Sequence, residues 1–206
     1  MNKQSPKHGI ILLAAGASTR LGRAKQLLIW QGETLLQRAV RKFSAIEDTH
    51  LLVVWGARKE EMEGPIRELE VDYVYNPAWE KGMGTSIKCG LKSLLQHHPD
   101  LESVMVTLVD QALVESNHLD AILEVHHTHP DQIIAASYED VLGVPALFPK
   151  SLLPALQNIP DQKGAGALIK KMREQVYPFS LPEAAFDVDR EEDYRTLLDF
   201  DAPFLD

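Results

Sequence analysis

Apolar stretches alternate with amphipathic stretches along the chain. Short apolar runs bounded by polar residues or glycine are typical of buried strands. They predict strands at residues 9–14, 51–55, 71–75, 103–109, 132–136 and 144–148. Apolar residues spaced by three and four positions predict helices between these strands. The expected helices are residues 34–46, 59–69 (which Gly64-Pro65 could interrupt), 85–96 (capped by Thr85 or Gly84), 116–127 (capped by Ser116), 151–157, 165–174 and 191–200.

This order of strands and helices predicts an α/β protein. Strands separated by helices favour right-handed crossovers and a mainly parallel sheet between helix layers. The pattern leaves the strand order open. Ligands of such open sheets bind beyond the carboxyl ends of the strands. The loop at residues 15–25 and Asp110 both follow predicted strands, so we expect them to meet in one crevice.

Composition narrows the class of protein. The 206 residues are expected to form a single domain, residues 1–206, with 45% hydrophobic residues. A net charge of −9 argues against a nucleic-acid or anionic-membrane binder, but a small anionic substrate remains compatible. The single cysteine, Cys89, the absence of a run of about 20 apolar residues and the polar first eight residues predict a cytoplasmic location.

The loop after the first predicted strand carries the strongest chemical signal. Small residues let backbone N–H groups approach an anion, and nearby cations neutralise phosphate charge. The small residues are Ala14, Ala15 and Gly16, and the cations are Arg20, Arg23 and Lys25, with no acidic residue before Trp30. The spacing matches neither the P-loop nor the dinucleotide-binding glycine motif. A nucleoside triphosphate site is predicted; the alternative is a tight turn with solvated basic residues.

Two carboxylates are candidates for a divalent metal ion. Asp110 ends an apolar strand, and Asp189 lies near the other end of the chain. Mg²⁺ prefers carboxylate and phosphate oxygens, so both could hold this ion. The alternatives are a turn or capping role for Asp110 and a capping role before the last helix for Asp189. Asp187 shares a face with Asp189 if the segment is extended, so either residue could reach the metal.

A glycine-rich segment at residues 82–87 precedes a predicted helix. Gly82 and Gly84 would allow close approach of a flat base, and Ser86 could hydrogen-bond to it. An ordinary glycine loop is the alternative. Trp79, just before this segment, is expected to pack in the core.

Five motifs in order resemble the MobA-like nucleotidyltransferases, and within them the molybdenum cofactor cytidylyltransferases. The resemblance covers about residues 9–198. The motifs are Leu13-Ala14-Ala15-Gly16 with Lys25-Gln26-Leu27-Leu28, Asn76-Pro77-Ala78-Trp79 with residues 82–87, Val109-Asp110-Gln111, residues 143–148, and Asp187-Val188-Asp189 leading into Glu192-Asp193. The resemblance implies a three-layer, Rossmann-like nucleotidyltransferase fold of the glycosyltransferase-A type with a mainly parallel sheet.

The resemblance also implies roles for individual residues. Lys25 would stabilise charge at the reacting α-phosphate, Arg20 would bind the β- and γ-phosphates, and Asp110 and Asp189 would hold Mg²⁺. The implied nucleotide-binding set is Leu13, Ala14, Ala15, Gly16, Ser18, Arg20, Lys25, Asn76, Gly82, Gly84 and Ser86. The implied acceptor-binding set is Gln111, Gly143, Pro145 and Lys163. Ala14-Ala15-Gly16 is similar to the cytidylyl branch, whereas the guanylyl branch tends to have Ala-Gly-Gly.

Some positions depart from the pattern of close relatives. Ala112 replaces a proline, residues 161–166 lack an arginine that Lys163 could replace, and residues 190–191 differ from the usual Thr-Pro. The implied activity is transfer of CMP from CTP to the phosphate of molybdopterin, and the implied client is a molybdenum hydroxylase. Two alternatives stay open: transfer to another small phosphate acceptor, and a non-catalytic carrier of the molybdenum cofactor.

Overall fold

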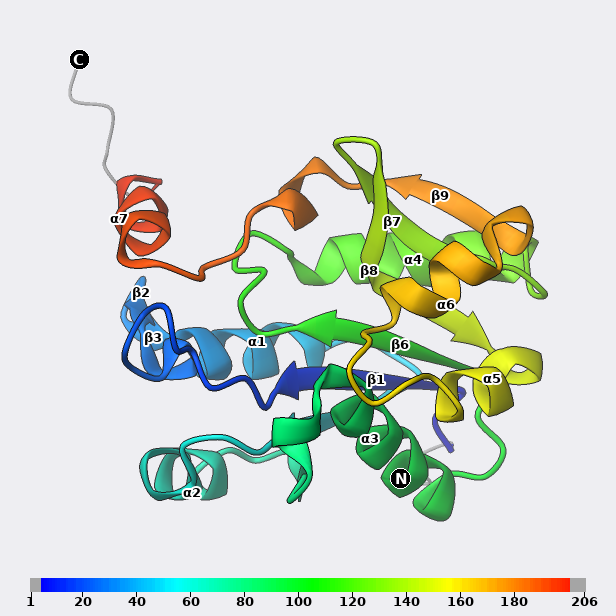
Figure 1. The fold of residues 1–206 in the computed structure, drawn as a ribbon. Helices are drawn as coiled ribbons and strands as arrows, with labels where there is room; N and C mark the ends of the chain where they lie inside the picture. The colour runs from blue at the N-terminus through cyan, green and yellow to red at the C-terminus, as the bar shows by residue number, and fades with distance from the viewer. Residues whose placement is uncertain (1–4, 201–206) are drawn as a thin grey trace.

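A seven-stranded sheet lies at the centre of the computed structural model, which describes residues 5–200 (Figure 1). The strands β5, β4, β1 and β6 are parallel, and β8 runs antiparallel to both of its neighbours, β6 and β7. The strand order is β5 (Asp72–Tyr75), β4 (Thr49–Trp55), β1 (His8–Ala14), β6 (Ser103–Leu108), β8 (Val141–Pro149), β7 (Ile133–Tyr138) and β9 (Val176–Ser180). The predicted mainly parallel α/β architecture is confirmed.

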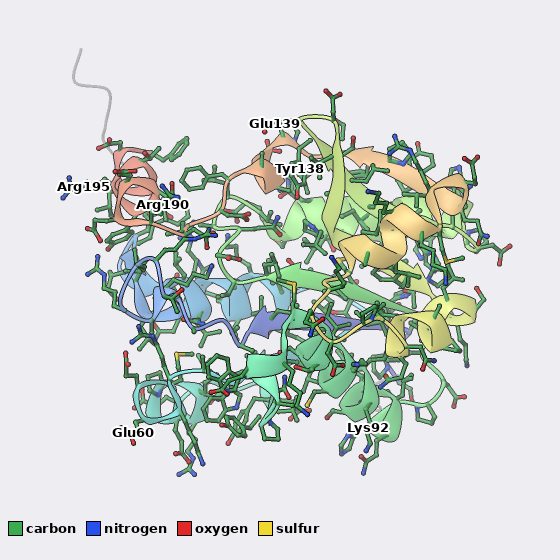
Figure 2. All side chains as sticks on the ribbon, in the orientation of Figure 1. Glu60, Lys92, Tyr138, Glu139, Arg190 and Arg195 are labelled. Atoms are coloured by element: carbon green, nitrogen blue, oxygen red, sulfur yellow. The ribbon has the colours of Figure 1, made fainter. Side chains whose placement is uncertain are left out.

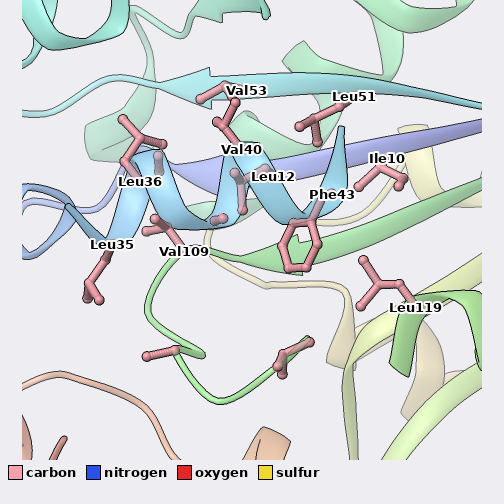
Figure 3. Packing of buried hydrophobic residues seen from close by; sticks show 14 of the residues in the cluster. Ile10, Leu12, Leu35, Leu36, Val40, Phe43, Leu51, Val53, Val109 and Leu119 are labelled. Carbon is pink, nitrogen blue, oxygen red and sulfur yellow. The ribbon is translucent and has the colours of Figure 1, made fainter. Parts of the chain in front are cut away.

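Helices cover both faces of this sheet. One face packs against α1 (Leu35–Phe43), α2 (Lys59–Arg67) and α4 (Ser116–Thr128), and the other against α3 (Met83–His97), α5 (Leu153–Gln157) and α6 (Gly166–Lys171). Alternation along β1 explains the two cores, because Ile10 and Leu12 face the first layer whereas Ile11 and Leu13 face the second. Figure 3 shows Ile10 and Leu12 beside Phe43 of α1.

The last helix, α7 (Glu191–Asp199), stands apart from these layers. It lies beside the short hairpin of β2 (Ile29–Trp30) and β3 (Glu33–Thr34) (Figure 1). The Tyr194 hydroxyl of α7 donates to the Ile29 carbonyl at 2.7 Å. The carboxyl-terminal part of the chain is thereby attached to the segment that follows β1. Short 3-10 helices cover Lys25–Leu27, Trp79–Lys81, Lys150–Leu152, Arg173–Gln175 and Pro182–Ala185.

Several helix ends differ from the prediction. Thr34 caps α1 instead of belonging to it, because its hydroxyl accepts from the Gln37 amide at 3.0 Å while the Gln37 side chain accepts from Thr34 N at 2.9 Å. The cap of α4 is Glu115 and not Ser116. Helix α3 begins at Met83 with Gly82 as its cap, two residues before the expected start.

Three strands were not predicted. Strands β2 and β3 have two residues each, and their turn places Gln31 and Gly32 at φ of +53° and +81°. Strand β9 is the third, and it pairs in parallel with β7. Within residues 5–200, no helix combines the length and the apolar character that crossing a membrane requires.

Candidate functional site

A pocket of about 320 Å³ opens at the carboxyl ends of β1 and β6. This position is where an open α/β sheet binds ligands. The structure brings together seven of the predicted site residues on its walls: Leu13, Ala14, Ala15, Gly16, Lys25, Ser86 and Asp110. Its walls also include Gln26, Trp79, Glu80 and Met83, which the sequence analysis did not assign to the site.

The side chain of Gln26 stabilises the conformation of the loop after β1. This side chain is 1% exposed, and Nε2 donates to the carbonyls of Ala14 at 2.7 Å and Gly16 at 3.0 Å. These bonds use both amide hydrogens, so the orientation of the amide group is fixed. The predicted motif contained Gln26, but nothing local to the sequence indicated that this side chain turns inward.

Two further contacts hold the rest of the loop. Arg58, at the start of α2, donates from Nε to the Ala17 carbonyl at 2.9 Å. Ser18 has a φ of +52°, and its hydroxyl accepts from Lys25 N at 3.2 Å. Ser18 therefore closes the loop upon itself and does not line the pocket.

Lys25 stands between the two predicted metal carboxylates. Its ammonium donates to Asp110 Oδ2 and, at 2.7 Å, to Asp189 Oδ1. The side chains of Lys25 and Asp110 are only 11% and 13% exposed, so their charges interact strongly. Burial opposes the charged form of Lys25, but the charges and hydrogen bonds of Asp110 and Asp189 together outweigh burial and raise the lysine pKa. The hydrogen bond from Lys25 lowers the pKa of Asp189.

Arg20 and Asp187 complete this charged group. Arg20 Nη1 lies 3.1 Å from Asp189 Oδ2, in an exposed ion pair. Asp187 retains contact with solvent, but partial burial and the charge of Asp110 raise its pKa to about 7. The amide of Val188 donates to the Asp110 carbonyl at 3.1 Å and so holds the segment with both aspartates against the end of β6.

The donor set suits a magnesium ion that shares its ligands with a substrate. Among residues 5–200, no group of three or more His, Cys, Asp and Glu side chains is placed to hold a metal ion. Asp110 and Asp189 do converge on one cation, the Lys25 ammonium. Mg²⁺ is typically bound by one or two carboxylates together with substrate phosphates. The two aspartates therefore fit this ion when a triphosphate supplies further oxygens.

The opposite wall is built around the start of α3. Asn76 is 3% exposed, and its Nδ2 donates to Thr85 Oγ1 and Ser86 Oγ, both at 2.9 Å. Asn76 thus positions Ser86, which lines the pocket. Trp79 was expected in the core, yet it is partly exposed and also lines the pocket.

Gly82 and Gly84 allow another segment of the protein to approach them closely. A Cβ on Gly82 would lie 2.6 Å from the Asp161 carbonyl oxygen, and one on Gly84 would lie 2.3 Å from that of Pro160. The Gly84 amide also donates to the Asp161 carbonyl at 2.9 Å. These glycines admit the segment at residues 160–164 to the start of α3, and they do not line the pocket.

The predicted acceptor residues lie outside the pocket. Gln111 is 3% exposed, and its Nε2 donates to the carbonyls of Val144 and Ala184, both at 2.9 Å. Gly143 leaves room for the hydroxyl of Tyr138, a residue labelled in Figure 2. Pro145 is buried in β8, whereas Lys163 is exposed on the segment against α3.

A family model of the MobA-like NTP transferase domain matches residues 10–176. The chain is 31% identical over 139 residues to the bifunctional protein GlmU of Cutibacterium acnes, covering 65% of this chain and 32% of that protein. It therefore spans about a third of the length of GlmU. It is 28% identical over 171 residues to nicotine blue oxidoreductase of Paenarthrobacter nicotinovorans, covering 78% and 80% of the two chains.

A third relative is the molybdenum cofactor cytidylyltransferase of Escherichia coli, 26% identical over 152 residues and covering 72% of this chain and 73% of that one. The crystal structure of Rv0371c from Mycobacterium tuberculosis superposes with a TM-score of 0.78 at 27% identity, covering 95% and 99%. A second structure of Rv0371c, in complex with manganese, has a TM-score of 0.74 at 25% identity, covering 94% and 98%.

Proposed function

This chain belongs to the MobA-like NTP transferase domain family, and from that premise we propose that it transfers CMP from CTP to the phosphate of molybdopterin. An oxygen of the acceptor phosphate attacks the α-phosphorus of CTP. The bond between the α-phosphorus and the bridging oxygen breaks, and pyrophosphate leaves. The relative named a molybdenum cofactor cytidylyltransferase supports this choice of substrates, as does the Ala14-Ala15-Gly16 start of the loop.

One observation carries the proposal: the cations of the loop after β1 meet two carboxylates at the pocket. Lys25 and Arg20 are in contact with Asp189, and Lys25 also contacts Asp110. Nucleotidyl transfer depends chiefly on positioning and on stabilising negative charge. Lys25 would neutralise charge on the α-phosphate, and Arg20 would neutralise charge on the departing pyrophosphate.

Mg²⁺ is the proposed cofactor, held by Asp110 and Asp189. When bound, such an ion would act as a Lewis acid and neutralise negative charge on the phosphates. Two hydrogen-bonding groups keep Asp110 at the end of β6. The backbone amide of Val188 donates to the Asp110 carbonyl, and the side-chain amide of the next residue, Gln111, donates to the carbonyls of Val144 and Ala184. A cytoplasmic location and a molybdenum hydroxylase client remain parts of the proposal.

The test is pyrophosphate release from CTP or GTP in the presence of Mg²⁺ and molybdenum cofactor. We expect release with CTP to exceed that with GTP, and the labelled nucleotide to appear in the cofactor. Lys25→Ala should lower turnover by about 100-fold or more, as loss of a group that stabilises transition-state charge does. Folded protein that releases no pyrophosphate with any acceptor would contradict the proposal.

Transfer to a different phosphate acceptor is the second candidate. The observation that favours this candidate is that residues 160–164 pack against α3, in the segment where the sequence departs from the acceptor motif of close relatives. The Asp161 carboxylate is paired with Lys88 of α3, and its backbone carbonyl accepts from Gly84 N. A panel of sugar phosphates and polyol phosphates beside molybdopterin distinguishes the two reactions by which acceptor supports pyrophosphate release.

A further inference from the structure

The charged groups of the site neutralise one another inside the protein. Both oxygens of Asp189 are engaged, Oδ1 by the Lys25 ammonium at 2.7 Å and Oδ2 by the Arg20 guanidinium at 3.1 Å. Lys25 also donates to Asp110. Two carboxylates thus face two cations. The carboxylates are the groups that a divalent ion needs, and the cations are the groups that a triphosphate needs.

Lys25 holds the position where both carboxylates converge. Its side chain is 11% exposed and lines the pocket, so the ammonium is largely shielded from bulk water. A divalent ion bound by Asp110 and Asp189 would meet this positive charge at contact distance, and like charges repel strongly where water is scarce. The ion and the ammonium therefore exclude each other from the space between the two aspartates.

We propose that Lys25 stands in for the divalent ion between Asp110 and Asp189, so that the metal and the triphosphate each strengthen the binding of the other. A triphosphate draws Lys25 and Arg20 away and frees the carboxylates for the metal. A metal ion on the carboxylates releases both cations for the triphosphate. Such coupling is reciprocal by thermodynamic necessity. The inference rests on the metal site of the proposed function.

The first test uses Mn²⁺ alone, with free ion measured by electron paramagnetic resonance. We expect Lys25→Met to bind Mn²⁺ at least tenfold more tightly than the unaltered protein, although the variant has lost a catalytic group. Arg23→Met is the matched control, because Arg23 pairs with Glu191 at 2.8 Å and touches neither metal carboxylate. It should leave Mn²⁺ binding unchanged. Adding Asp110→Asn to Lys25→Met should abolish the gain.

The second test measures binding of the triphosphate without the metal, and it uses CTP with a metal chelator. Asp189→Asn removes the partner of both cations, so we expect this variant to bind CTP several-fold more tightly than the unaltered protein in calorimetry. Circular dichroism checks that each variant is folded, and Lys25→Gln replaces Lys25→Met if the latter is not. Equal or weaker Mn²⁺ binding by the lysine variant, or weaker CTP binding by Asp189→Asn, would overturn the inference.

Failure here is distinct from failure of the proposed function. If the unaltered protein releases pyrophosphate but Lys25→Met binds Mn²⁺ with unchanged affinity, the proposed enzyme activity stands and the stand-in role of Lys25 is wrong. Tighter Mn²⁺ binding in Lys25→Met without pyrophosphate release from any acceptor supports the stand-in role in a protein that is not this enzyme.

Discussion

At the scale of single residues, Gln26 decides the shape of the nucleotide loop. Replacing it with Leu keeps the volume of the side chain but leaves the Ala14 and Gly16 carbonyls without their donor. A buried polar group that loses its partner costs about 1–3 kcal/mol. We expect Gln26→Leu to lower the free energy of unfolding by this amount and to weaken CTP binding, measured by urea denaturation and calorimetry. Unchanged values for both would show that the loop holds its shape without Gln26.

His8 makes the stability of the protein depend on pH. It is 4% exposed at the start of β1, and Nδ1 lies 2.8 Å from Ser103 Oγ. Burial, and then the nearby His126, lower its pKa from 6.5 to about 4; Glu102 opposes this shift, while His127 and Lys7 add to it. Between pH 6.5 and 4, His8 is therefore protonated in the unfolded chain but neutral in the folded protein.

The resulting stability is complete above pH 6.5 and is lost as the pH falls from 6.5 towards 4. The loss attributable to His8 is at most about 3 kcal/mol. Urea unfolding at pH 7.5 and pH 5 measures it. His8→Gln should reduce the difference in the free energy of unfolding between the two pH values. A larger difference in His8→Gln would mean that the sign is wrong.

At the scale of elements, the start of α3 depends on glycine for packing. Gly84→Ala would push a methyl group against the Pro160 carbonyl oxygen, 2.3 Å away, so residues 160–164 would have to move. Overpacking of this kind costs about 1–3 kcal/mol. Gly166→Ala at the first residue of α6 is the matched control, because no atom beyond its own helix and chain neighbours lies within 4 Å of its Cβ, and alanine favours a helix by up to about 1 kcal/mol. In thermal unfolding, we expect Gly84→Ala to have a lower Tm than the unaltered protein and the control variant to have a higher one.

Elements with a strong local signal were predictable from the sequence, and those whose existence depends on distant contacts were not. The apolar runs of β1, β4 and β6 mark buried strands in any context, and the loop after β1 identifies its own chemistry. Strand β9 exists because it pairs with β7, and no periodicity marks it. The turn between β7 and β8 was hidden because Glu139 and Asp140 adopt φ of +46° and +63° without a glycine.

The same division holds within the site. Lys25 and Asp110 each follow a strand, so their convergence was predictable from the rule that ligands bind at carboxyl ends. The glycines at 82 and 84 were predicted to admit a flat base, whereas the structure shows them packed against the backbone of residues 160–164. What approaches them is a segment almost 80 positions later, which only the folded chain reveals. Asp189 likewise reaches Lys25 across 164 positions, through a segment held by Val188 and α7.

At the scale of the whole molecule, the site is assembled from both ends of the chain. Arg20 and Lys25 come from the loop after the first strand, and Asp189 comes from the last segment; the exposed ion pair of Arg23 and Glu191 joins the same two segments. The site is therefore complete only in the folded state, and a ligand that binds there stabilises that state alone. Ligand binding can be followed through the unfolding of the entire protein, without knowledge of the acceptor.

Thermal unfolding with CTP or GTP and Mg²⁺ is thus a direct test of the base preference. A ligand at 100 times its Kd adds about 2.7 kcal/mol, which for a protein of this size raises Tm by about 5–10 °C. We expect such a rise with CTP and Mg²⁺ together, a smaller one with GTP, and little with Mg²⁺ alone, because Lys25 occupies the carboxylates. Lys25→Ala should reduce the rise with CTP and Mg²⁺. An equal or larger rise with GTP would remove the cytidylyl assignment while leaving the nucleotidyltransferase in place.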